Sequence, residues 1–145
     1  MAQMNKVRII AGGLAAGVVM NVIDFLANGL WLGSRWQAQA ELIRPGMAQQ
    51  AERMSTAGWV TVDLLAGIIV VWLYAAIRPR FGPGPRTALC AGFVLWLITR
   101  LIFASYVFNG FYTWRLIAAS SAGSLVAALL GALLGGMLYK EAASA

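Results

Sequence analysis

The stretch IIAGGLAAGVVMNVIDFLANGLWL, from Ile9 to Leu32, decides the fold of this chain. It is apolar almost throughout, and it exceeds the roughly 20 residues that an α-helix needs to cross a hydrocarbon core of about 30 Å. Three later stretches have the same character. We therefore predict four transmembrane spans, over residues 8–32, 57–77, 87–109 and 115–139.

Composition supports a membrane protein and excludes an ordinary soluble domain. The chain has 145 residues, of which 61% are hydrophobic and only 11% are charged, and its mean hydropathy is +0.75. The spans use nearly all of residues 1–145, so the sequence predicts one all-α domain, a polytopic four-transmembrane-helix bundle. The first span is longer than the apolar core of a signal peptide, which is about 7 to 15 residues, so we expect it to be retained.

The one long connection, residues 33–55, has a helix-forming composition on both sides of a Pro-Gly pair. Trp36, Ala40 and Ile43 recur at helical spacing, which predicts a short interfacial helix before the pair and a second one after it. The connection is expected to be a surface connector or, alternatively, a lid over a cavity.

The charge pattern predicts the orientation. Lys and Arg near the membrane number six on the side of the termini and four on the other side, which favours both termini in the cytoplasm. Trp31, Trp59 and Trp114 would mark the opposite interface, and Tyr74 and Tyr139 the cytoplasmic one. The formal charge of +6 is scattered and forms no patch that would bind nucleic acid, so the expected surroundings are the lipid bilayer.

Small residues form two stripes along the fourth span, and they predict close helix packing. The first stripe contains Ala119, Gly123, Ala127, Gly131 and Gly135, and the second contains Ser120, Ser124, Ala128, Ala132 and Gly136. Gly13 and Gly17 give the first span a similar face. We favour packing within the bundle; the alternative is a homodimer or a larger membrane complex through the face on the fourth span.

Polar residues inside the spans define the candidate site. A charge at the bilayer centre costs at least about 2.5 to 3.5 kcal/mol, so such residues are rare and are often functional. Three of these residues are charged: Asp24, Asp63 and Arg100. At a rise of 1.5 Å per residue, they lie about 6 to 14 Å below the non-cytoplasmic interface. The predicted polar network or ligand site contains Asn21, Asp24, Asn28, Asp63, Arg100, Ser120 and Ser124.

Two interpretations of this site stay open. Asp24 and Arg100 could form a structural ion pair that fixes the register of the helices. Alternatively, the two acids and one base could line a pocket that opens toward the non-cytoplasmic side and binds a proton, a cation or another ligand.

Residue types that carry most enzyme and metal chemistry are scarce. Histidine is absent, and Cys90 is the single cysteine, so a cysteine cluster for a metal cannot form. Neither serine nor cysteine has an evident general base nearby in the pattern, so we expect no catalytic residue, no metal and no cofactor. Cys90 is expected to be a small buried hydrophobic residue in the third span.

Two segments carry a family resemblance, NVIDFLANGLWLGSRW (Asn21 to Trp36) and VWLYAAIRPRFGPGPRTALCAG (Val71 to Gly92). The chain resembles a group of uncharacterised small bacterial four-span inner-membrane proteins, in which an acidic residue recurs at the place of Asp24 and an RPRFGPGP-type turn joins spans two and three. The resemblance implies a multi-pass protein of the bacterial inner (plasma) membrane and transfers no catalytic residue.

The functional expectation follows from the site and from the missing catalytic residues. We expect a non-catalytic accessory or scaffold helix bundle with a buried Asp/Arg polar network. The alternative is a small proton- or cation-linked transporter or channel that uses Asp24 as its titrating site.

Overall fold

The computed structural model describes residues 4–142, except for the side chains of residues 52–55. Every regular element in this part of the chain is helical. In chain order the helices are α1 (Lys6–Asp24), the π-helix η1 (Phe25–Trp31), α2 (Gly33–Ile43), α3 (Met47–Phe81), α4 (Pro85–Phe108) and α5 (Trp114–Leu138).

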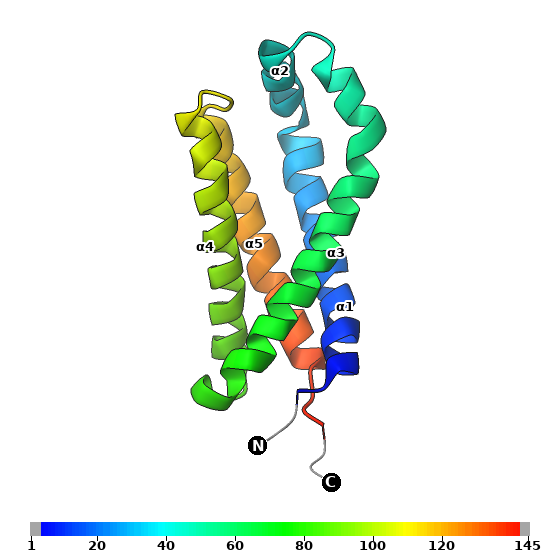
Figure 1. Cartoon of the computed structure of the whole chain (residues 1–145), viewed down its shortest axis with the longest axis vertical. Helices are drawn as coiled ribbons and strands as arrows, with labels where there is room; N and C mark the ends of the chain where they lie inside the picture. The colour runs from blue at the N-terminus through cyan, green and yellow to red at the C-terminus, as the bar shows by residue number, and fades with distance from the viewer. Residues whose placement is uncertain (1–3, 143–145) are drawn as a thin grey trace.

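Four of the described segments are long and apolar enough to cross a membrane, which confirms the predicted fold class. They are Lys6–Trp31, Thr56–Phe81, Pro85–Phe108 and Trp114–Leu138. Both ends of the described chain lie at the same end of the bundle, which we call the proximal end (Figure 1). The distal end carries α2 and the loop between α4 and α5.

The helices are held together mainly through α1 and α5. The first packs against both α3 and α5, whereas α4 packs chiefly against α5. At the crossing of α1 and α3, a Cβ atom on Gly67 would lie only 2.3 Å from the carbonyl oxygen of Gly13 and 2.3 Å from the amide nitrogen of Gly17. The two backbones therefore touch directly, as the small residues of the first span predict.

Both small-residue stripes of α5 also pack inside the chain. A Cβ on Gly135 would lie 3.1 Å from the carbonyl oxygen of Gly12 in α1. On the neighbouring stripe, a Cβ on Gly136 would lie 3.1 Å from the Cβ of Ala88 in α4. The preference for internal packing is confirmed, while a homodimer or larger membrane complex stays a prediction.

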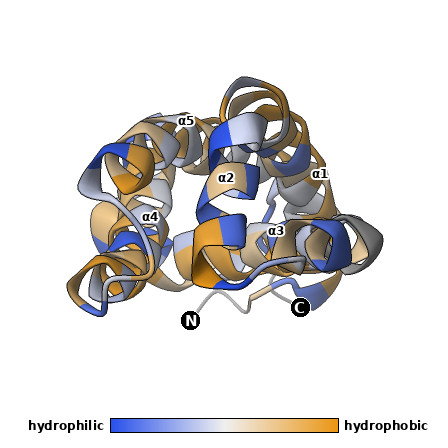
Figure 2. Cartoon of the chain, turned by 90° about the horizontal axis from the view of Figure 1, so that it is seen from above, coloured by the Kyte–Doolittle hydropathy of each residue, from blue (hydrophilic) through white to orange (hydrophobic). Residues whose placement is uncertain are grey.

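Packing is much tighter in the proximal half than in the distal half. The described buried residues of α4 lie between Thr87 and Gly92, in its first two turns. Those of α3 lie between Gly67 and Ala75, which is also its proximal part. Beyond these levels α4 diverges from α3 (Figure 1), whereas α5 still approaches η1, where a Cβ on Gly123 would lie 2.5 Å from the Cβ of Ala27. Figure 2, viewed from the distal end, shows α2 in the middle between α4 and α3.

The connection between the first two spans differs in part from its prediction. The first interfacial helix is confirmed as α2, and Trp36, Ala40 and Ile43 are all half-buried. The second helix is not separate, because α3 starts at Met47 and continues without a break into the span. Gly46 supplies the turn between them, since its φ of 80° lies in the left-handed region that favours glycine.

Two further local features were not expected from the sequence. η1 widens the end of the first span into a π-helix, in which the amide of Leu32 donates to the carbonyl of Ala27, five residues back. Cys90 was expected to be buried, but it is exposed on α4. It lies on the part of the α4 surface that no other described helix covers, where a small apolar thiol can face lipid.

Candidate functional site

Asp24 lies where α1 passes into η1, and a chain of hydrogen bonds connects it to α2. Its Oδ1 accepts from Nδ2 of Asn28 at 3.2 Å. The Oδ1 of Asn28 accepts in turn from the indole Nε1 of Trp36 at 3.3 Å. Asp24 and Asn28, four residues apart, therefore lie on the same side of the first span. Trp36 was not among the predicted site residues, although its helical spacing with Ala40 and Ile43 predicted the helix that carries it.

Asn21 joins α1 to α3 in the distal half. Its Nδ2 donates to the carbonyl of Gly17 at 3.1 Å and to the carbonyl of Val60, on α3, at 3.3 Å. These two hydrogen bonds satisfy the side-chain NH₂ group of Asn21, as required where little water is available to pair with it. Its observed contacts are structural.

Asp63 and Arg100 are half-buried but poorly satisfied. Within residues 4–142, neither side chain forms a hydrogen bond or an ion pair with a described group. The guanidinium carbon of Arg100 lies 4.5 Å from the ring centroid of Phe103, one turn along α4, and forms a cation–π contact with it. The Nε of Arg100 is buried without a hydrogen-bond partner among the described residues.

The described residues show no hydrogen bond or ion pair that joins Asp24, Asp63 and Arg100 to one another. Asp24 lies within electrostatic range of both other charges, but no ion pair of 4 Å or less joins these described residues. Arg100 belongs to α4, which packs chiefly on α5 and also on α3, the helix of Asp63. Depth along the helices stays a prediction, and by itself it does not specify which side chains pair.

The two serines do not join the charges either. Ser120 is buried on α5, and the hydroxyl of Ser124 donates to the backbone carbonyl of Ser120 at 2.9 Å. The expected pocket beside the three charges, at the distal end, stays a prediction. A hollow does lie at this end, but its walls come from α2 and the start of α5, and none of the three charges lines it.

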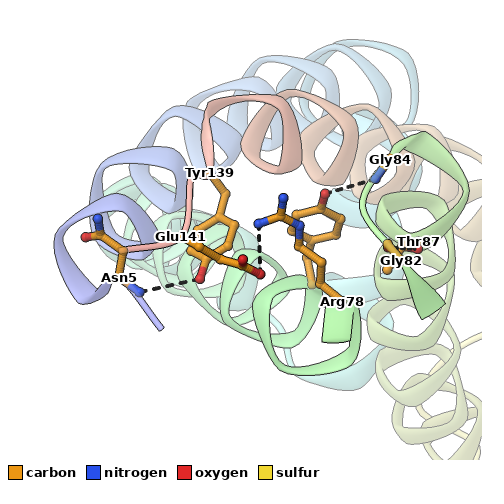
Figure 3. A network of polar contacts seen from close by, with 8 residues as sticks. Asn5, Arg78, Gly82, Gly84, Thr87, Tyr139 and Glu141 are labelled. Carbon is orange, nitrogen blue, oxygen red and sulfur yellow. Dashed lines mark hydrogen bonds and ion pairs between the residues drawn. The ribbon is translucent and has the colours of Figure 1, made fainter. Parts of the chain in front are cut away.

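The best-connected polar cluster lies instead at the proximal end (Figure 3). Nη1 of Arg78 forms an ion pair with Oε1 of Glu141 at 3.0 Å. The guanidinium carbon of Arg78 also lies 5.7 Å from the ring centroid of Tyr139. This ring meets that of Tyr74 edge to face at 6.0 Å, so the end of α3 is tied to the C-terminal segment.

Two hydrogen bonds extend this cluster to the N-terminal segment and to the turn between α3 and α4 (Figure 3). The phenolic oxygen of Tyr139 accepts from the amide of Asn5 at 3.4 Å, and that of Tyr74 accepts from the amide of Gly84 at 3.2 Å. Inside the turn, the hydroxyl of Thr87 donates to the carbonyl of Gly82 at 2.7 Å. Sequence placed the two tyrosines at one interface, but no local pattern pairs groups so distant in the chain.

The described residues contain no group of three or more His, Cys, Asp or Glu side chains that could hold a metal ion. No protein-family model, curated protein or solved structure matches the chain. The resemblance to bacterial four-span proteins stays a prediction.

Proposed function

We propose that this chain is a non-catalytic accessory or scaffold helix bundle of the membrane. The observation that supports this proposal most directly is the backbone contact of α1 with α3 and α5 in the proximal half. Four apolar helices are compatible with an integral membrane protein, and their packing favours a rigid body over one that opens and closes.

The glycine contacts support this proposal because they fill the space that a transport path would need. A Cβ on Gly13 would lie 2.5 Å from the Cα of Ile68 in α3, and one on Gly12 would lie 3.0 Å from the carbonyl oxygen of Gly135 in α5. Neither gap admits even a methyl group without movement of backbone. A solute that entered between the distal helices would therefore meet packed backbone before it reached the proximal end.

Localisation to the bacterial inner membrane, with both termini in the cytoplasm, is part of the same proposal. Two facts support the orientation. The N-terminal and C-terminal segments lie at one end, where Asn5 contacts Tyr139. The same end carries six of the Lys and Arg residues near the membrane, against four at the other end.

A small proton- or cation-linked transporter or channel that uses Asp24 is the second candidate. One observation favours it: η1 begins directly after Asp24, and π-helical turns are frequently found at functional sites. The unpaired Asp63 lies within electrostatic range of Asp24. A titrating site would have both a carboxylate with few partners and a locally irregular helix.

A proton-flux measurement separates the two candidates. Protein reconstituted into liposomes with an internal pH-sensitive dye should dissipate an imposed pH gradient no faster than protein-free liposomes. Asp24→Asn is the matched variant, because the new carboxamide oxygen can still accept from Asn28. A wild-type flux several times the protein-free rate that Asp24→Asn abolishes would refute the scaffold proposal and support the transporter.

A further inference from the structure

The distal end contains a hollow of about 450 Å³ between α2 and the start of α5. Its polar lining consists of Arg35 and Gln39 from α2, with Thr113 and Arg115 from the first turn of α5. Two arginines from separate parts of the chain thus border one concave space. The volume falls within the range of about 300 to 1,000 Å³ that is typical of small-molecule sites.

Positive charge in this hollow is not neutralised by the described part of the protein. The one ion pair among described residues, Arg78 with Glu141, lies at the proximal end. The closest acid along α2 is Glu41, and its carboxylate accepts from the amides of Gly46 and Ala48. Neither Arg35 nor Arg115 is paired with a described carboxylate.

The start of α5 adds to the positive potential. Thr113 is the N-cap of this helix, and its first turn contains no acidic residue. Free amide groups and the helix dipole at such a terminus favour a bound anion. The two arginines supply charged donors in the fork geometry that suits phosphate oxygens.

The hollow also lies at the level where lipid headgroups are expected. Trp114 directly precedes Arg115 and is exposed, as is Trp31 at the end of η1. Tryptophans on membrane proteins concentrate at the interface between hydrocarbon and water. Leu42 and Leu116 supply apolar walls beside the arginines, which suits a ligand with a charged head and an apolar body.

We propose that this hollow binds the phosphate headgroup of an anionic phospholipid. Arg35 and Arg115 hold the phosphate oxygens, while Leu42 and Leu116 contact the start of the acyl chains. Binding would join α2 to α5 at the distal end. The proposal concerns different residues from the proposed scaffold function and does not depend on it.

Native mass spectrometry of the detergent-solubilised full chain can test the proposal with phosphatidylglycerol as the probe. Wild-type protein should retain this lipid in preference to phosphatidylcholine, whose choline group places a positive charge near the arginines. Arg35→Gln with Arg115→Gln should weaken phosphatidylglycerol binding by about tenfold or more, because two charge-assisted contacts are lost. Both side chains are exposed, so the double variant should still fold, as circular dichroism would verify.

Arg80→Gln with Arg86→Gln is the matched control, because it removes two exposed charges from the opposite end. This variant should keep at least about half of the wild-type binding. An equal loss in both double variants would overturn the proposal in favour of nonspecific charge attraction. Competition by soluble glycerol 3-phosphate as strong as that by the lipid would also overturn it, since the site would then hold a free phosphate ester.

Discussion

Gly67→Ala offers the sharpest test of the close contact between α1 and α3. The new Cβ would lie 2.3 Å from the carbonyl oxygen of Gly13 and 2.3 Å from the amide nitrogen of Gly17. Ordinary contact begins near 3.4 Å, so the two helices would have to separate by roughly 1 Å. Both neighbouring atoms belong to the backbone, so no rotation of a side chain can relieve the contact.

The expected loss follows from two opposing terms. Overpacking usually costs about 1 to 3 kcal/mol, and a clash with backbone belongs near the upper limit. Replacing glycine by alanine in a helix returns up to about 1 kcal/mol. Gly67→Ala should therefore lower the free energy of unfolding by about 2 kcal/mol.

Gly58→Ala is the matched control, because it makes the same substitution in α3 with no atom within 4 Å of the new Cβ. Its stability should equal or slightly exceed that of the wild type. Unfolding of the solubilised protein by SDS, followed by circular dichroism, would measure both variants, with an expected difference of about 3 kcal/mol. Equal stability of the two variants would show that α1 and α3 do not touch at Gly67.

Two other substitutions probe the ends of the bundle. Trp36→Phe keeps a ring beside Tyr112 but removes the hydrogen-bond donor to Asn28, so it should lower the free energy of unfolding by about 1 kcal/mol. Trp36→Ala also removes the ring contact and should markedly raise hydrogen exchange in α2. Unchanged exchange would show that Trp36 does not hold α2 against the bundle. Glu141→Gln should cost no more than about 1 kcal/mol in thermal unfolding, because its ion pair with Arg78 is partly exposed, and a much larger loss would assign the pair a dominant role.

Sequence predicted the helices of this fold well because membrane crossing requires long apolar runs. It also predicted how they approach one another at Gly13 and Gly17, since small residues at four-residue spacing permit backbone contact in lipid. The π-helix after Asp24 was missed because it depends on hydrogen bonds five residues apart, for which FLANGLW carries no simple pattern. The exposure of Cys90 was missed because lipid-facing and buried apolar positions have similar composition.

The candidate site was predicted less well, and the reason is geometric. Depth from the interface depends only on the number of residues along a helix, so it does not specify which charges lie side by side. The direction in which Arg100 points depends on which helices pack together, and α4 packs chiefly on α5. Contacts within one span, such as Asp24 with Asn28, could be predicted from the sequence. Contacts between distant segments, such as Arg78 with Glu141, could not.

The central claim is that helix packing, and not an ion pair between Asp24 and Arg100, holds this bundle together. A double-mutant cycle of Asp24→Asn and Arg100→Leu measures their coupling free energy directly. We predict a coupling free energy no larger than about 1 kcal/mol, because the two side chains interact electrostatically without a hydrogen bond or an ion pair of 4 Å or less. A coupling of about 3 kcal/mol or more, with Arg100→Leu rescuing the stability of Asp24→Asn, would reveal a buried ion pair and contradict the claim.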